Sequence, residues 1–203
     1  YPGSKDFWSD MKKPAVFLDR DGTLIEEVNF LLNEKQIKVW PKAIKAMSLL
    51  RRKGFLLIVL SNQSGVARGY LTEERVEDLN RAVFSQMRMM GEVPDAFFFC
   101  PFHPEAKLEQ YRRETDLRKP GPGMAYLAAQ KFDIDLARSY SVGDKLSDVG
   151  LGQNLGGKGA LVLTGYGQEQ KNKLGSETEY MPDCIASDIL EAAEWIVSDL
   201  ESE

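Results

Sequence analysis

The sequence has few of the residues from which disulfide frameworks and zinc clusters are built. Its 203 residues include only two cysteines, Cys100 and Cys184. They lie far apart in the chain, so no C-x-x-C pair is present and no disulfide framework is indicated. This usage is typical of a reducing compartment, and we expect a cytoplasmic protein.

Long apolar runs and net positive charge are also missing. No segment reaches the roughly 18 to 20 consecutive apolar residues that a membrane-spanning helix needs, and the polar start, residues 1–6, has no signal-peptide core. The formal net charge is -5 and the pI is near 5.2, whereas a nucleic-acid binder usually presents a clustered basic surface. We expect no nucleic-acid partner, no membrane partner and a monomeric state.

Apolar runs of strand length alternate with helical patterns along the chain. Strands are predicted at 15–18, 55–60, 96–99, 139–142 and 160–163. Helices are predicted at 42–53, after a cap at Thr72, at 123–132, at 146–155 and after a cap at Ser187. Such alternation predicts an α/β fold with a doubly wound, mostly parallel, Rossmann-like sheet and right-handed crossovers.

The length and spacing of these elements indicate one domain. We expect residues 1–12 to be a disordered lead-in and residues 13–203 to form a single domain. The stretch 100–119 is too long for a mere connection and too short for a domain, so it is predicted to be a loop insertion. Neither it nor the segment between Thr23 and Lys42 can bury a core of its own. We therefore expect a nearly capless protein, that is, one with no separate domain covering the strand ends.

Four short polar motifs lie where predicted elements end or begin. They are Asp-Arg-Asp-Gly-Thr at 19–23 after the first strand, Ser-Asn-Gln-Ser-Gly at 61–65 after the second, Arg-Lys-Pro at 118–120 before the third helix, and Gly-Asp-Lys-Leu-Ser-Asp at 143–148 after the fourth strand. Open α/β sheets hold their ligands at the carboxyl ends of their strands, so these motifs are expected to meet at one edge. Any one of them alone is more often a turn or a cap, but the ordered set favours a functional site.

The two carboxylates of the first motif suit phosphoryl transfer. Asp19 is the candidate nucleophile, because an aspartate can form an acyl-phosphate and so divide one difficult displacement into two easier ones. Asp21, two residues later, can donate a proton to the departing alkoxide and later take one from water.

The other motifs supply the charges that such a reaction needs. Asp19 and Asp144 can give oxygen ligands to Mg²⁺, a hard cation, and Asp148 is expected to orient the groups around the metal. Lys119 can neutralise the phosphoryl group while Ser61 donates a hydrogen bond to it.

From about Ala15 to Gly165 this ordered set resembles the haloacid dehalogenase superfamily of aspartate-nucleophile phosphatases. Longer strings are similar to those of the D-glycero-D-manno-heptose 1,7-bisphosphate phosphatases, and their relatives the histidinol-phosphate phosphatases share most of them. The strings are Phe-Leu-Asp-Arg-Asp-Gly-Thr, Ser-Asn-Gln-Ser-Gly-Val-Ala-Arg-Gly, Cys-Pro-x-His-Pro, Arg-Lys-Pro-x-Pro-Gly-Met and Val-Gly-Asp-Lys-x-x-Asp.

The resemblance implies specific roles for residues of these motifs. The aspartates of the first motif are nucleophile and acid/base in that family, which implies these roles for Asp19 and Asp21. The resemblance implies that Asp19, the backbone carbonyl of Asp21 and Asp144 are the magnesium ligands. It also implies that Ser61 and Lys119 stabilise the phosphoryl group. The residues implied in substrate binding are Asn62, Gln63, Ser64, Arg118 and Lys145.

The chain departs from the family in the stretch after the third strand. Family members commonly hold this stretch with zinc through a Cys-x-His pair and a Cys-x-Cys pair. Cys100 is present, but three ligand positions carry other residues: Phe102, Thr115 and Leu117. One cysteine and the offset His103 are too few ligands for a structural zinc site, so zinc is not expected. We expect packing of Phe102 and Tyr111 against the domain to hold the loop instead.

The leading hypothesis is a magnesium-dependent phosphatase that removes the 7-phosphate of a heptose 1,7-bisphosphate in carbohydrate metabolism. Histidinol phosphate or another small sugar phosphate is the alternative substrate. Two further possibilities are a receiver-like module phosphorylated once on Asp19 and an inactive binding protein. The position of Asp21 and the late Gly-Asp-Lys-x-x-Asp string favour the phosphatase over the receiver-like module. The binding protein is less favoured because no catalytic position is missing.

Overall fold

The computed structural model describes residues 12–202 and contains one six-stranded sheet, so all but one residue of the predicted lead-in lies outside the described residues. The strands are β1 Lys13–Leu18, β2 Leu56–Asn62, β3 Ala96–Cys100, β4 Ile134–Gly143, β5 Lys158–Val162 and β6 Cys184–Ala186. Their order is β3-β2-β1-β4-β5-β6 and every neighbouring pair is parallel. The predicted fold class is confirmed.

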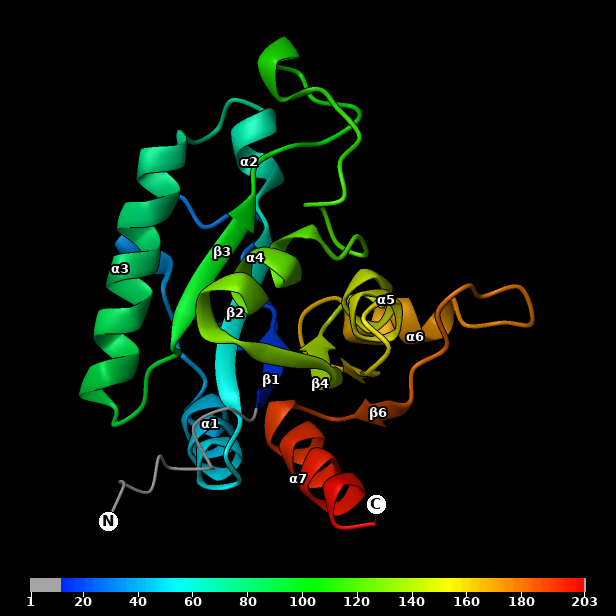
Figure 1. The fold of residues 1–203 in the computed structure, drawn as a ribbon. Helices are drawn as coiled ribbons and strands as arrows, with labels where there is room; N and C mark the ends of the chain where they lie inside the picture. Colours follow the sequence, from blue (N-terminus) through cyan, green and yellow to red (C-terminus); the bar gives the residue numbers. More distant parts are fainter. Residues whose placement is uncertain (1–11, 203) are drawn as a thin grey trace, which may run out of the picture.

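Helices cover both faces of this sheet (Figure 1). They are α1 Pro41–Arg52, α2 Ser64–Ala67, α3 Glu73–Met89, α4 Gly123–Phe132, α5 Leu146–Asn154, α6 Gly167–Asn172 and α7 Ile189–Leu200, with 3₁₀ turns at Glu34–Gln36 and Glu109–Tyr111. Within residues 12–202, none of them is long and apolar enough to cross a membrane.

Alternation along β1 divides the core into two layers. Val16 and Leu18 are buried with side chains of α1, α3 and α7. Ala15 and Phe17 are buried on the other face with side chains of α4 and α5. Because successive side chains of a strand point to opposite faces, an uninterrupted apolar run is what a strand covered on both sides requires.

Local signals fix where the helices begin and end. Pro41 lies in the first turn of α1, and Gly54, with φ of 89°, follows its last turn. The predicted cap of α3 is confirmed, since the Thr72 side chain accepts a hydrogen bond from the backbone N–H of Arg75 at 3.2 Å. The predicted cap of α7 is wrong by one residue. Asp188 and not Ser187 caps this helix, because a carboxylate can accept from two orphan N–H groups at once.

Other differences arise where the chain gives weak patterns. β4 begins at Ile134, five residues before the predicted start. Its first residues, Ile134 and Asp135, pair with Lys13 and Pro14, and the register then shifts before the next pair, Val16 with Tyr140. The short elements β6, α2 and α6 were not predicted, since three to six residues are too few to establish a period. Cys184 lies on β6 and is half-buried.

The strand order creates a switch point beside β1. From β1 the chain proceeds to β2 and β3 on one side, and it later places β4 on the other side. The loops that follow β1 and β4 therefore leave the sheet next to each other, where a ligand crevice forms in open α/β folds. The segments 19–40 and 101–122, which flank this edge, contain only short 3₁₀ turns and isolated bridges.

The packing of α7 against the sheet gives a stability prediction. Ile196 is fully buried in the layer shared with α1, so Ile196→Ala should lower the free energy of unfolding by about 2 to 4 kcal/mol. Glu194→Ala, at an exposed position of the same helix, is the control and should change it by less than about 0.5 kcal/mol. Urea denaturation measures both, and equal values for the two variants would contradict this description of the core.

Candidate active site

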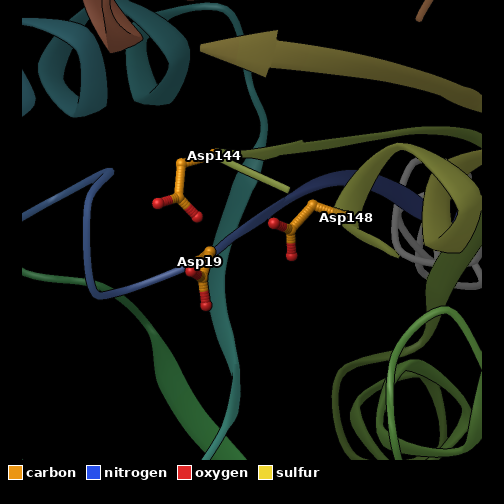
Figure 2. A group of neighbouring side chains, drawn as sticks. All are labelled: Asp19, Asp144 and Asp148. Carbon is orange, nitrogen blue, oxygen red and sulfur yellow. The ribbon is translucent and has the colours of Figure 1, made fainter. Parts of the chain in front are cut away.

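Three buried aspartates meet at the carboxyl edge of the sheet. Asp19 follows β1, Asp144 follows β4 and Asp148 lies in the first turn of α5, and Figure 2 shows the three side chains grouped together. One carboxylate oxygen from each lies within 4.8 Å of the others. The backbone N–H of Asp19 donates to the carbonyl of Val142 at 3.0 Å, which ties the end of β1 to β4.

Lys119 brings a positive charge to this group from the loop before α4. Its Nζ lies 2.9 Å from Asp19 Oδ1 and 2.6 Å from Asp148 Oδ1, and it donates to the Leu60 carbonyl at 2.5 Å. Burial alone would lower the pKa of Lys119, but the carboxylates of Asp148 and Asp19 outweigh it and raise that pKa. Lys119 is therefore a fixed positive charge beside the Asp19 carboxylate.

A pair of hydrogen bonds fixes the backbone of Lys119. The Asn62 side chain, at the end of β2, accepts from the Lys119 N–H and donates to the Lys119 carbonyl, each at 3.1 Å. A predicted substrate-binding residue thus also joins the loop to the sheet.

Two glycines allow the backbone to approach Asp144 closely. A Cβ atom at Gly22 would lie 2.3 Å from Asp144 Oδ2, and one at Gly165 would lie 2.2 Å from it. Both glycines have positive φ, 76° and 54°, a conformation that other residues rarely adopt. Asp144 Oδ2 accepts from the Tyr166 N–H at 2.8 Å, whereas Oδ1 is buried without a hydrogen-bond partner among the described residues.

These features fit a hard cation. Among the described residues, Lys119 is the ion-pair partner of these three carboxylates, so two negative charges have no direct partner when all are ionised, and one buried oxygen of Asp144 is free to accept. Burial, followed by the charges of Asp19 and Asp148, raises the pKa of Asp144 to about 8. A divalent cation with oxygen ligands would relieve this excess charge.

Asp21 points to a second group of polar side chains. Arg20 Nη2 lies 2.8 Å from Asp21 Oδ2. Gln63 Nε2 donates to Asp21 Oδ2 at 3.0 Å and to Ser61 Oγ at 2.7 Å. Gln63 thus links Asp21 to Ser61, two residues that the sequence had placed in one reaction.

A cavity of about 280 Å³ opens beside these residues. Of the residues predicted from sequence, those lining it are Asp21, Asn62, Gln63, Ser64 and Lys145. Arg68 and Tyr166 also line it and were not predicted individually. Arg68 belongs to the motif string that runs from Ser61 to Gly69, which is a signal that could have identified it, whereas no pattern singled out Tyr166. The Lys145 ammonium lies 4.7 Å from the centre of the Tyr166 ring.

Arg118 is the one predicted binding residue that faces a different neighbour. Its Nη1 donates to the Phe102 carbonyl at 3.3 Å, and burial lowers the pKa of Arg118. The Phe102 ring lies 6.0 Å from the ring of Tyr111, and the Arg113 guanidinium carbon lies 3.8 Å from the Phe102 centroid. As expected, Phe102 packs against the buried layer of the sheet that α4 covers. The Tyr111 hydroxyl donates to Glu73 Oε1 of α3 at 2.9 Å, and the Phe102 ring also contacts Tyr111 and Arg113.

Cys100 and His103 engage the backbone of this loop. Cys100 Sγ contacts the Phe102 carbonyl at 3.8 Å. His103 Nδ1 accepts from the Glu105 N–H at 3.0 Å, and the His103 N–H donates to the Tyr111 carbonyl at 3.1 Å. Both side chains therefore have partners within the protein.

Comparison with known proteins agrees with this geometry. A family model described as HAD-hyrolase-like matches residues 116–192. The chain is 39% identical over 195 residues to the D-glycero-D-manno-heptose-1,7-bisphosphate 7-phosphatase of Thermosynechococcus vestitus, covering 94% of this chain and 98% of that one. It is 40% identical over 154 residues to the D-glycero-beta-D-manno-heptose-1,7-bisphosphate 7-phosphatase of Escherichia coli K12, covering 75% of this chain and 80% of that one.

The fold has a matching solved structure. The D,D-heptose 1,7-bisphosphate phosphatase of B. bronchiseptica, crystallised with magnesium and phosphate, gives a TM-score of 0.77 at 28% identity, covering 92% of this chain and 99% of that one. The sheet and its aspartate site define a phosphatase of the haloacid dehalogenase type. Within that class, the chain belongs to the family of D-glycero-D-manno-heptose 1,7-bisphosphate 7-phosphatases.

The raised pKa of Asp144 predicts how stability depends on pH in metal-free protein. Because the pKa is about 8 in the folded protein and 3.8 ordinarily, the folded state holds this proton more tightly. This tighter binding of the proton stabilises the folded state. The stabilisation is complete below about pH 4 and is lost as pH rises toward about 8. We expect the free energy of unfolding to fall across this range, and to fall less steeply in Asp144→Asn.

Urea denaturation in chelator at several pH values measures this effect. Asp78→Asn, at an exposed position of α3, is the control and should retain the slope of the unmodified protein. An unchanged slope in Asp144→Asn would show that Asp144 titrates as an ordinary carboxyl group.

Proposed function

We propose that this protein is a magnesium-dependent phosphatase that removes the 7-phosphate of D-glycero-D-manno-heptose 1,7-bisphosphate. The observation that carries the proposal is the Asp19 carboxylate, buried beside Lys119 and beside the unpartnered oxygen of Asp144. A nucleophile, a fixed cation and a place for a metal thus lie together at the switch point of the sheet. The substrates named for its relatives support the choice of sugar phosphate.

Asp19 and Asp21 both act in each half of the reaction. A carboxylate oxygen of Asp19 bonds to phosphorus as the bond between phosphorus and the sugar oxygen breaks. Asp21 gives its proton to that departing oxygen. In the second half Asp21 takes a proton from water, whose oxygen bonds to phosphorus and releases Asp19 with inorganic phosphate.

Lys119 and Ser61 act on the phosphoryl group throughout. Lys119 is held by Asn62 and by the Leu60 carbonyl, so its charge is oriented before the substrate arrives. Preorganised charge of this kind requires no rearrangement as negative charge develops in the transition state. The Ser61 hydroxyl accepts from Gln63, which leaves its own proton for a phosphoryl oxygen.

Asp19, Asp144 and the backbone carbonyl of Asp21 would hold Mg²⁺, with Asp148 beside them. When bound, the ion neutralises charge on the phosphoryl oxygens. Asp148 pairs with Lys119 at 2.6 Å and accepts from the Lys145 N–H at 3.1 Å. It therefore orients the lysine and the start of α5 around the ligands.

The rest of the substrate occupies the cavity. Asn62, Gln63, Ser64 and Lys145 line it. Lys145 has no carboxylate within ion-pair distance among the described residues, so it suits an anionic or hydroxyl-rich ligand. Arg118 adds positive charge from the neighbouring loop.

Residues 13–203 act as a single phosphatase domain in the cytoplasm, with 100–119 as a loop insertion that brings Lys119 to Asp19, and with no separate cap. The cysteine usage and the short flanking segments support this organisation.

Phosphate release tests the proposal. In buffer with Mg²⁺, the protein should turn over heptose 1,7-bisphosphate many times and prefer it to histidinol phosphate. Asp19→Asn should lower kcat by about 10³-fold or more, because an amide cannot replace the nucleophile. Asp78→Asn is the control and should keep the unmodified rate. Preference for histidinol phosphate would contradict the substrate, and full turnover by Asp19→Asn would contradict the mechanism.

The loop after β3 gives a second test. We expect purified protein to contain well below one zinc per chain, and added zinc should leave its melting temperature unchanged. Phe102→Ala should destabilise the protein by less than the ~3 to 5 kcal/mol of a fully buried phenylalanine, because Phe102 is half-buried. Tyr126→Ala, at an exposed position of α4, is the control. One bound zinc per chain, or equal effects of the two substitutions, would contradict this account of the loop.

A further inference from the structure

Arg20 is a buried charge for which the reaction above gives no role. It lies between the two aspartates of the first motif, and only 1% of its surface is exposed. Burying a guanidinium group is costly unless every charge and donor finds a partner. The partners that it has therefore indicate what it does.

Most of the Arg20 donors face one carboxylate. Nε lies 3.2 and 3.1 Å from the two carboxylate oxygens of Asp21, and Nη2 lies 3.0 and 2.8 Å from them. This is the two-pronged geometry in which arginine fixes both the position and the plane of a carboxylate. Nη2 also donates to Gln63 Oε1 at 3.2 Å, and Gln63 in turn donates to Asp21.

The remaining Arg20 donor group is held from α3. Its Nη1 donates to Asn80 Oδ1 at 2.7 Å. Asn80 is 4% exposed, and the other buried residues of α3 are apolar: Val76, Leu79, Val83 and Met87. Asn80 Nδ2 has no hydrogen-bond partner among the described residues. A polar residue on an otherwise apolar helix face is therefore used for its one hydrogen bond to Arg20.

We infer that Arg20 is a positioning residue for Asp21, and that Asn80 holds Arg20 in place through α3. The inference rests on the proposed function, because it concerns the proton that Asp21 transfers. Arg20 fixes the position and plane of the Asp21 carboxyl group, which lines the cavity proposed for the sugar. Loss of Arg20 should then impair proton transfer and leave the attack by Asp19 largely intact.

Leaving groups of different basicity separate these two effects. When the alkoxide of a sugar phosphate departs, the bond from phosphorus to oxygen breaks as Asp21 transfers its proton to that oxygen. When 4-nitrophenyl phosphate is the substrate, the nitrophenolate departs as a stable anion and needs no proton. Both esters form the same aspartyl-phosphate on Asp19, so the comparison must be made on this first step.

The experiment compares single-turnover rates of the first step in Arg20→Met. Rapid quench measures heptose 1-phosphate formed from the bisphosphate, and stopped flow measures the burst of nitrophenolate. We expect Arg20→Met to lower the rate of the first step with the sugar ester by about 10²-fold, the usual size of a general-acid contribution. The rate with the nitrophenyl ester should fall by a factor at least tenfold smaller. Arg20→Lys should recover part of the sugar-ester rate, because it keeps the charge but not the two-pronged contact.

Two further variants keep the inference testable if Arg20→Met does not fold. Asn80→Leu is close in size and removes only the hydrogen bond to Arg20. The first-step rate should therefore fall more with the sugar ester than with the nitrophenyl ester, and the two losses should differ by at least about threefold. Arg81→Met, at an exposed position of α3, is the matched control and should change neither rate. Equal losses on the two esters in folded Arg20→Met or Asn80→Leu would overturn the inference, as would no loss at all.

The proposed function and this inference fail in different ways. If the unmodified protein formed no aspartyl-phosphate from either ester, the proposed function would be wrong. If it formed the intermediate from both, and the Arg20 and Asn80 variants lost both rates equally, only the positioning role would be wrong.

Discussion

The pairing of buried Lys119 with Asp19 and Asp148 is the interaction on which the geometry of the site depends. Its members come from the end of β1, the loop after β3 and the first turn of α5. Removing one partner from a buried pair leaves an uncompensated charge, which typically costs about 3 to 5 kcal/mol. The loop must therefore bring Lys119 back to the sheet, and the two hydrogen bonds from Asn62 to the Lys119 backbone hold it there.

The same group is left short of positive charge. The Lys119 ammonium cannot balance three carboxylates, and burial together with the charges of Asp19 and Asp148 raises the pKa of Asp144 to about 8. Gly22 and Gly165 let the backbone pack against Asp144 Oδ2, whereas Asp144 Oδ1 is buried with no hydrogen-bond partner among the described residues. A site that is destabilised in this way when empty is suited to bind a cation.

Sequence patterns predicted the parts of the fold and site that depend on short-range signals. Apolar runs such as 55–60 identified the buried strands, and the strand ends placed Asp19, Ser61 and Asp144 at one edge. The register shift in β4 and the three-residue β6 could not be predicted, because their partners are distant in sequence. Nor could the contact of Arg20 with Asn80, since sixty residues separate them and neither residue type signals a partner.

Trapping the covalent intermediate tests the central claim most directly. Borohydride reduces an acyl-phosphate of aspartate to homoserine, so brief reaction with substrate, treatment with borohydride and peptide mass spectrometry locate the nucleophile. We expect homoserine at position 19, dependent on substrate, and unmodified aspartate at positions 21, 144 and 148. Modification at another aspartate, or none during active turnover, would contradict the assignment of Asp19 as nucleophile.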